Sequence, residues 1–287
     1  MRSHSLMGSG GSGTKAEGKL KMVDGEVKAE GEFRVLATND DGIYSDGIRA
    51  MVEELLKLAK VSVVAPDRER SATGHAITVL RPLMVEKIDF YGLDVEAWAV
   101  DGTPSDCVKL AIEELLVERP QVVVSGINRG PNLGTDVFYS GTVSAAVEGV
   151  ILGVPSIAVS VAAFENCNYA YAARFAARVV SKIREKGLPP GTLLNINVPS
   201  VDEPQIAGVR ITRLGTRKYK DVFDKRVDPR GRTYYWLAGD VVECDEGEET
   251  DTVAVRNNRI SITPIHCDFT RYDLLDPLND WFSDGER

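Results

Sequence analysis

The sequence predicts an α/β protein with three layers, in which helices cover both faces of a mostly parallel sheet. Short apolar runs recur between residues 34 and 199, and they lack a polar face. Segments with apolar residues at every third or fourth position lie between these runs. Strands that are apolar on both faces and alternate with helices are typical of parallel sheets buried on both sides.

Each apolar run is predicted to be a buried strand. The predicted strands are residues 35–38, 61–65, 95–100, 121–125, 156–160 and 193–198. Helical spacing is found over residues 48–59, 141–152 and 169–186. A further helix is expected to start at Thr103 and Pro104, because a hydroxyl cap and a proline in the first turn both favour a helix start.

The two ends of the chain differ from this alternating region. Residues 8–13 read GSGGSG, and the tetrapeptide KAEG occurs at residues 15–18 and again at 28–31. This composition is typical of a flexible linker, so residues 1–33 are interpreted as an appended tag or linker; the alternative is a native polar extension. Residues 34–200 are predicted to form the catalytic core. Residues 201–287 are predicted to form a β-rich C-terminal extension of the same domain, which serves as an oligomerisation arm. Its apolar pieces at residues 209–214, 233–237 and 259–265 are interpreted as hairpins.

Composition excludes several classes of protein. Of the 287 residues, 43% are hydrophobic, which is enough for a large core. The net charge of −9 disfavours a stable complex with nucleic acid or an anionic membrane. A run of about 18 apolar residues, as a membrane span requires, does not occur. The four cysteines are widely spaced, which favours free thiols in a reducing compartment, and the expected location is therefore cytoplasmic.

Two adjacent carboxylates follow the first predicted strand. Ligands of open parallel sheets bind at the carboxyl ends of the strands, and Asp40 and Asp41 lie at such an end, followed by Gly42. Neighbouring carboxylates repel each other, and a bound cation relieves the repulsion. Ligand sets made only of oxygen favour Mg²⁺ or Mn²⁺. The alternative interpretation is a solvated Asp-Asp-Gly turn, which is common in loops.

Other predicted strand ends supply neutral oxygen donors and an anion site. Ser71 follows the second strand and Asn128 follows the fourth, so both are candidates to complete a metal shell. The alternative for each is a side chain that caps its own loop. Ser140, Gly141 and Thr142 precede an apolar helix, whose first backbone N–H groups and macrodipole favour a bound phosphate. The alternative there is ordinary helix capping.

Two residues near Ser71 are further candidates for substrate contact, namely Gly74 and His75. Several common catalytic motifs are not found in the sequence. A Gly-Lys-Ser/Thr ending of a phosphate-binding loop, an HExxH zinc motif and a GxSxG nucleophile elbow do not occur.

Taken together and in their order, five segments resemble the SurE family of 5′/3′-nucleotidases, also called survival protein E. The segments are Thr38-Asn39-Asp40-Asp41-Gly42, Pro66-Asp67-Arg68 with Ser71 and His75, Asp101-Gly102-Thr103-Pro104, Ser125-Gly126-Ile127-Asn128-Arg129-Gly130-Pro131-Asn132 and Tyr139-Ser140-Gly141-Thr142-Val143-Ser144-Ala145-Ala146. The resemblance runs from Arg34 to about Trp281, whereas residues 1–33 have no counterpart in the family.

The resemblance implies a Rossmann-like domain with a β-rich C-terminal extension that is used in homodimers or homotetramers. It also implies a metal-dependent phosphatase of nucleoside monophosphates, with activity on short polyphosphate in some members. The family's metal ligands correspond to Asp40, Asp41, Ser71 and Asn128, which would hold one Mg²⁺ or Mn²⁺ per subunit. Its phosphate contacts correspond to the helix start at residues 140–142 and to Asn39 or Asn128.

The predicted mechanism is hydrolysis by water activated at the metal, with Asp40 orienting or deprotonating that water. Direct attack by an aspartate is the competing chemistry, disfavoured because carboxylates bound to a metal are poor nucleophiles. Two other classes of protein stay open at this point. A phospho-receiver module also carries paired acids after its first strand, and a haloacid-dehalogenase-like phosphatase would need Asp-x-Asp in place of Asp-Asp.

Overall fold

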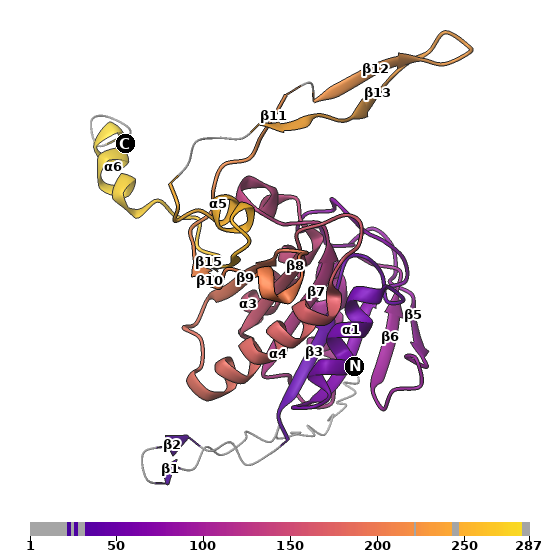
Figure 1. The fold of residues 1–287 in the computed structure, drawn as a ribbon, viewed down its shortest axis with the longest axis vertical. Coiled ribbons are helices and arrows are strands. Elements are labelled where there is room, and N and C mark those ends of the chain that lie inside the picture. The colour runs from indigo at the N-terminus through magenta and orange to yellow at the C-terminus, as the bar shows by residue number, and fades with distance from the viewer. Residues whose placement is uncertain (1–21, 24–25, 28–31, 221, 243–246, 283–287) are drawn as a thin grey trace, which may run out of the picture. The chain divides into compact units, whose positions relative to one another are not determined.

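The computed structural model describes residues 22–23, 26–27, 32–220, 222–242 and 247–282 (Figure 1). The chain divides into two compact units, Met1–Glu32 and Phe33–Arg287. In the first unit, β1 (Met22–Val23) pairs with β2 (Glu26–Val27) in antiparallel orientation. Most of the predicted tag or linker lies outside the described residues, so its interpretation stays a prediction.

The second unit is built on one nine-stranded sheet, in the order β10-β15-β9-β8-β7-β3-β4-β6-β5. Its strands are β3 (Arg34–Thr38), β4 (Lys60–Pro66), β5 (Val85–Ile88), β6 (Glu96–Val100), β7 (Val122–Arg129), β8 (Ser156–Val161), β9 (Thr192–Val198), β10 (Val209–Ile211) and β15 (Ile260–His266). The central strands β6, β4, β3, β7, β8 and β9 are mutually parallel, while β5 and β15 pair antiparallel to their neighbours β6 and β9. The predicted mostly parallel α/β sheet is confirmed.

The order of the strands creates a switch point beside β3. The chain runs outward from β3 through β4 to β6, returns to the other side of β3, and continues outward through β7, β8 and β9. Sheets of this kind open a crevice where the strand order reverses, outside the carboxyl ends of the two strands. The topology therefore places the ligand site at the ends of β3 and β7.

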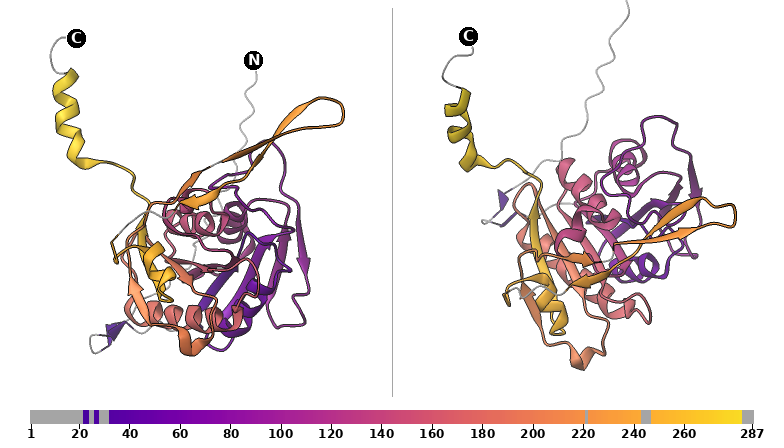
Figure 2. Two further views of the ribbon diagram at one scale, coloured as in Figure 1. Left: turned by 45° about the horizontal axis from the view of Figure 1, so that its top comes forward. Right: turned by 90° about the horizontal axis from the view of Figure 1, so that it is seen from above.

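Helices pack on both faces of the sheet (Figure 2). The main helices of this unit are α1 (Asp46–Leu55), α2 (Pro104–Leu110), which continues into the π-helical turn η1 (Ala111–Leu115), α3 (Gly141–Ile151), α4 (Tyr169–Lys186) and α5 (Asp251–Arg256). Helices α1 and α4 contact each other, as do α2 and α3. Short 3-10 turns are η2 (Gly134–Phe138), η3 (Glu203–Gln205) and η4 (Tyr272–Leu274). None of the helices in the described part of the chain combines the length and apolar character that a membrane span requires.

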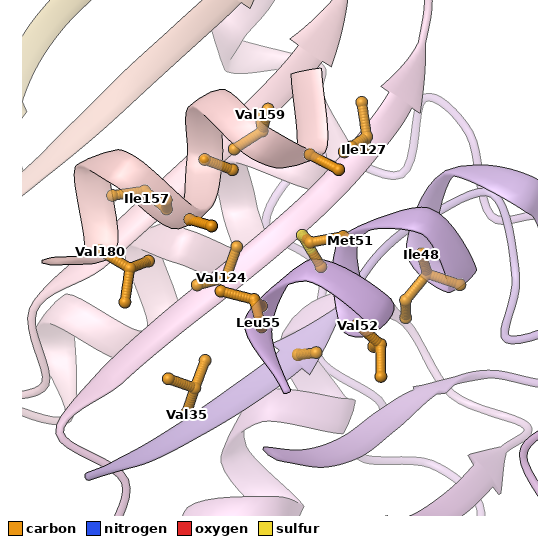
Figure 3. Packing of buried hydrophobic residues seen from close by; sticks show 14 of the residues in the cluster. Val35, Ile48, Met51, Val52, Leu55, Val124, Ile127, Ile157, Val159 and Val180 are labelled. Carbon is orange, nitrogen blue, oxygen red and sulfur yellow. The ribbon is translucent and has the colours of Figure 1, made fainter. Parts of the chain in front are cut away.

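Alternating side chains of β3 explain why both faces of the sheet are covered. Val35 and Ala37 belong to the core cluster with α1 and α4, whereas Leu36 packs in the cluster with α2 and α3. Figure 3 shows the first cluster, in which Met51 and Leu55 of α1 pack over the strands. The buried residues Val35 to Ala37 of β3 are apolar, and the charged residues Asp40 and Asp41 follow the end of the strand.

Two local predictions are wrong. Residues 126–129 were expected to begin a loop, but β7 continues to Arg129, with a shift in its pairing to β8 between Gly126 and Asn128. The sequence Gly-Ile-Asn-Arg looks like a loop, but the long neighbouring strand β8 offers it backbone partners. The pieces at 209–214 and 259–265 were expected to be hairpins, but they supply β10 and β15 to the main sheet.

The remaining C-terminal strands lie outside the main sheet. Strand β11 (Lys218–Lys220) pairs with β14 (Asp240–Val242), and β12 (Phe223–Val227) pairs with β13 (Thr233–Leu237), both antiparallel. The predicted hairpin at 233–237 is therefore confirmed. A short helix, α6 (Leu275–Phe282), ends the described chain. We call β11–β14 and α6 the C-terminal arm.

Candidate functional site

The two strands that flank the switch point carry the predicted ligands at their ends. Strand β3 pairs with β7 in parallel up to Thr38 and Ser125, so both strands end at one rim. Asp40 and Asp41 follow β3, and Asn128 is the penultimate residue of β7. The backbone N–H of Arg129 donates to Asp41 Oδ2 at 3.0 Å, which ties the two strand ends together. The structure therefore brings the predicted acid pair and the predicted asparagine to the same place.

Asp40 is held against the start of α3. Its side chain is only 4% exposed, and Thr142 Oγ1 donates to its Oδ1 at 2.6 Å. A Cβ atom added to Gly141 would lie 2.8 Å from the Cβ of Asp40 and 2.9 Å from its Oδ2. Only glycine at this position lets the helix approach the carboxylate so closely. Ser140 caps α3, since its hydroxyl accepts from the backbone N–H of Val143 at 3.1 Å.

Burial shifts the titration of both acids in the same direction. Loss of water raises the pKa of Asp40 to about 6; the hydrogen bond from Thr142 opposes this shift and the charge of Asp41 adds to it. Burial also raises the pKa of Asp41, against the lowering effect of Arg129. The pair is therefore costly to ionise in the protein alone, and a cation between the two groups would offset that cost.

The loop after β4 brings Ser71 to this rim. The backbone N–H of Arg70 donates to the carbonyl of Asp40 at 2.7 Å, and that of Gly74 donates to the carbonyl of Tyr139 at 3.1 Å. Both anchors connect the loop to segments that form the site. The hydroxyl of Ser71 itself is exposed and donates to Glu69 Oε1 at 2.7 Å. As a metal ligand, Ser71 would have to exchange this bond.

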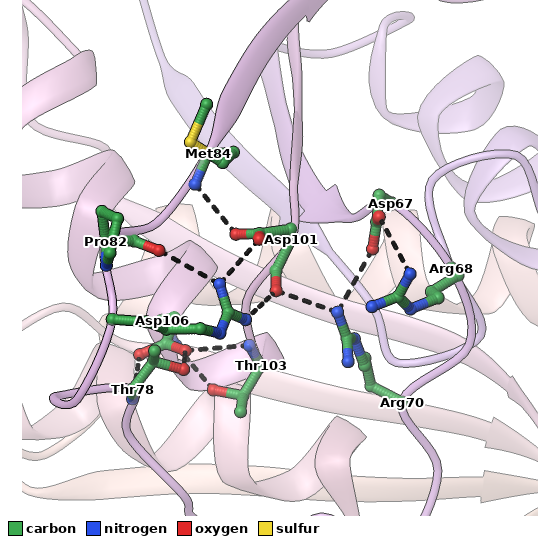
Figure 4. Close-up of polar contacts among 10 residues, drawn as sticks. Asp67, Arg68, Arg70, Thr78, Pro82, Met84, Asp101, Thr103 and Asp106 are labelled. Carbon is green, nitrogen blue, oxygen red and sulfur yellow. Dashed lines mark hydrogen bonds and ion pairs between the residues drawn. The ribbon is translucent and has the colours of Figure 1, made fainter.

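A polar network fixes the rest of this loop to the end of β6 (Figure 4). Arg70 Nη2 donates to the carbonyl of Asp101 at 2.9 Å, and Arg81 binds the carboxylate of Asp101 at 2.6 Å. Thr78 is bound through its N–H and its hydroxyl to the buried carboxylate of Asp106, at 2.9 and 2.6 Å. The loop that carries Ser71 is thus held at several points along its length.

The two predicted asparagines are oriented by their own turns. Asn39 is fully buried, and its amide nitrogen donates to Gly42 O at 2.9 Å and to Ser45 Oγ at 2.8 Å. Its Oδ1 is buried and accepts no hydrogen bond from the described residues. The amide nitrogen of Asn128 donates to Gly130 O at 2.8 Å. Both contacts shape the loops that carry the site.

His75 contacts a residue that the sequence analysis missed. Its Nε2 lies 2.8 Å from Oε2 of Glu148, a buried residue of α3, and Lys109 Nζ of α2 lies 3.1 Å from Oε1. The hydrogen bond from His75 is the main cause that lowers the pKa of Glu148. One sequence signal was available, because Glu148 is the only charged residue of residues 141–152. A lone charge in a buried helix needs partners.

The donors gathered at the rim fit a hard divalent cation. Among the described residues, no group of three or more His, Cys, Asp or Glu side chains is arranged to hold a metal ion. The predicted set has two carboxylates, one hydroxyl and one amide, and such oxygen donors suit Mg²⁺ or Mn²⁺. Asp40 is buried beside a second acid, so a bound cation would stabilise its ionised form.

Comparison with known proteins agrees with the fold and with the motifs. Residues 35–221 match the family model of Survival protein SurE. A protein of Heliobacterium modesticaldum named 5′-nucleotidase SurE is 57% identical over 253 residues, which cover 88% of this chain and 93% of the relative. A protein of the same name from Carboxydothermus hydrogenoformans is 54% identical, covering 87% of this chain and 96% of the relative.

A solved structure resembles the fold as well. The crystal structure of the SurE protein from Aquifex aeolicus superposes with a TM-score of 0.77 at 43% identity, and the match covers 88% of this chain and all of that chain. The comparisons do not support the receiver module or the haloacid-dehalogenase-like phosphatase. On the family match and on these identities, the chain belongs to the SurE family.

Proposed function

We propose that this chain is a divalent-metal-dependent phosphohydrolase that releases phosphate from nucleoside 5′- and 3′-monophosphates. One observation carries the proposal: a buried carboxylate, Asp40, is held by Thr142 against the start of α3 and lies next to a second acid, Asp41. A cation held by this pair would lie beside a helix start that favours phosphate. The name 5′-nucleotidase, carried by relatives that are more than half identical, supports the substrate class.

The proposed cofactor is one Mg²⁺ or Mn²⁺ per subunit, held by Asp40, Asp41, Ser71 and Asn128. When bound, such an ion polarises a phosphate oxygen and lowers the pKa of a water molecule. The acid pair is the fixed part of the ligand set, since the backbone of Arg129 and the hydroxyl of Thr142 orient its two carboxylates.

The residues of the chain supply the remaining chemistry. Asp40 is placed to orient the attacking water and to accept its proton, because the hydroxyl of Thr142 fixes its carboxylate beside the start of α3. The first turn of α3 offers backbone N–H groups and the positive end of the helix dipole to the phosphoryl oxygens. The polar network that connects the Ser71 loop to the end of β6 holds this loop at the site. Attack by water is proposed over attack by an aspartate, and a phosphorylated Asp40 or Asp41 trapped during turnover would overturn this choice.

The proposal is tested by measuring phosphate release from a panel of 5′- and 3′-mononucleotides while the metal is varied. Chelation with EDTA is expected to abolish the activity, and Mg²⁺ or Mn²⁺ is expected to restore it. Short polyphosphate in the same panel tests the additional activity that we propose for this site. Phosphate release that persists unchanged in EDTA would contradict the metal-dependent mechanism.

We also propose that the chain works as a homodimer or homotetramer in the cytoplasm. The C-terminal arm supports the oligomer, because it exposes large apolar side chains: Trp236 is 60% exposed and Trp281 is 75% exposed. Tryptophan and other aromatic residues are enriched at protein–protein interfaces. Light scattering of the full chain tests the proposal, and a monomer at every concentration would contradict it.

A further inference from the structure

A surface cavity of about 300 Å³ adjoins one member of the acid pair. Asp41 lines it, whereas Asp40, which faces α3, does not. The other lining residues are Tyr44, Ser45, Asp46, Glu69, Arg129 and Tyr169. The volume lies at the lower end of the range for small-molecule pockets, about 300–1,000 Å³. A substrate whose phosphate binds at the pair would therefore have a cavity for the rest of the molecule beside it.

The cavity presents aromatic surface from two helix starts. Tyr44 precedes α1 and is 60% exposed, and its carbonyl accepts a hydrogen bond of 2.7 Å from Tyr91 Oη, which fixes its backbone. Tyr169 begins α4 and is partly buried; its Cε1 lies 3.2 Å from where a Cβ on Gly47 would be, so its ring packs on the start of α1. Exposed aromatic faces on fixed backbone are suited to stacking a planar base.

The charges in the cavity disfavour a second phosphate. If a cation neutralises Asp41, the remaining charged groups are Asp46 and Glu69 against Arg129, whose guanidinium lies 4.0 Å from Glu69. The local charge is then negative, and anionic groups such as a further phosphate would be repelled. A neutral group with an aromatic ring and hydroxyls fits this environment, since the carboxylates accept hydrogen bonds from hydroxyls.

We propose that this cavity is the nucleoside subsite, in which the base stacks on Tyr44 while the phosphate lies at the acid pair and the start of α3. The assignment rests on the proposed function and makes it more specific. Tyr44 then acts as a specificity-determining residue. The enzyme should prefer nucleoside monophosphates over small phosphomonoesters, which leave the cavity empty. It should also prefer them over nucleoside diphosphates and short polyphosphate, which bring a second phosphate, so the proposed activity on polyphosphate should be the weaker one.

The test compares two substrates, adenosine 5′-monophosphate and glycerol phosphate, in the native protein and three variants. For Tyr44→Ala, kcat/KM for the nucleotide is expected to fall about tenfold more than for glycerol phosphate, mainly through KM, because stacking on an aromatic ring is lost. Tyr44→Phe keeps the ring and is expected to retain the native preference. Tyr139→Ala removes a tyrosine that is 69% exposed on the α3 side of the pair, and serves as the matched comparison.

Several outcomes would overturn the assignment. An equal change for both substrates in Tyr44→Ala would show that the ring does not contact the base. A selective loss in Tyr139→Ala alone would place the base on the other side of the acid pair. Calorimetry with adenosine separates this proposal from the proposed function: binding to the native protein but not to Tyr44→Ala supports the subsite even if no phosphomonoester is cleaved, and absence of binding to the native protein contradicts it.

Discussion

The rim of the sheet and the C-terminal arm break the usual rules of burial in opposite ways. The rim buries polar groups, including Asp40 and Asn39, although burial raises the pKa of Asp40 and leaves Asn39 Oδ1 without a hydrogen bond from the described residues. The arm exposes large apolar groups such as Trp236. In the described part of the chain, the rim contains buried polar atoms without partners, and the arm contains apolar side chains that are not covered. From this comparison we infer a charged ligand at the rim and an apolar partner for the arm, as proposed above.

The largest expected effect comes from neutralising the acid pair. Asp40→Asn or Asp41→Asn should lower phosphatase activity by at least about 10²-fold, the range for loss of a central electrostatic group. The change keeps the size of the side chain, so thermal unfolding should show a folded protein. Steady-state kinetics at saturating metal measures the effect. Full activity in either variant would contradict a role of the acid pair in catalysis.

The second prediction concerns the close approach of α3 to Asp40, which depends on Gly141. In Gly141→Ala the new Cβ would meet Asp40 at 2.8 Å, so the helix start or the carboxylate must shift. We expect a loss of activity on the order of tenfold to 10²-fold, since small misplacements of reacting groups are costly. Ser144→Ala, one turn further along the same helix, is the control and should retain most activity. Equal activity in both variants would show that the contact with Asp40 is dispensable.

A third prediction concerns Glu148, which connects α3 with the Ser71 loop through His75 and with α2 through Lys109. Glu148→Gln should destabilise the protein by about 1–2 kcal/mol near neutral pH, because charged hydrogen bonds to His75 and Lys109 are lost. The folded-state pKa of Glu148 is lowered, so its contribution is present above the unfolded value of 4.5 and is lost as the pH falls through the folded value. Urea unfolding of both proteins at several pH values measures the difference, which should shrink in acid. A difference that stays constant into acid would contradict this role.

The smallest effect on the chemistry is expected in the arm. Trp236→Ser should weaken self-association and leave the fold of the sheet unchanged, because the side chain lies on β13 outside the main sheet. Sedimentation across a range of concentrations measures the change. The control is Lys225→Ser on β12, where a charge is removed from the same ribbon. If neither variant alters the association state, the arm is not the contact.

The sequence was most informative where one physical constraint dominates. Strands buried on both faces are mostly apolar, so β3, β4, β6, β7, β8 and β9 could each be located, and α4 was predicted at its observed bounds. The position of the acid pair could also be predicted. Charged side chains are rarely buried without a partner, so two adjacent aspartates mark the point where a buried strand ends.

Other features depend on partners that are distant in the chain. The place of β15 beside β9 is set by pairing across more than sixty residues, as between Ser261 and Asn197, and local composition does not encode it. The contact of His75 with Glu148 likewise joins two segments that are 73 residues apart. The cavity beside Asp41 combines residues that follow β3 and β4, end β7 and begin α1 and α4, and neither spacing nor hydrophobic pattern marks it.

Calorimetric titration of Mn²⁺ into the metal-free protein tests the central claim most directly. We expect one ion to bind per subunit in the native protein, and no binding in Asp41→Asn at the same concentrations. Native protein that takes up no Mn²⁺, or a variant that binds it as tightly as the native protein does, would contradict a cation at the acid pair.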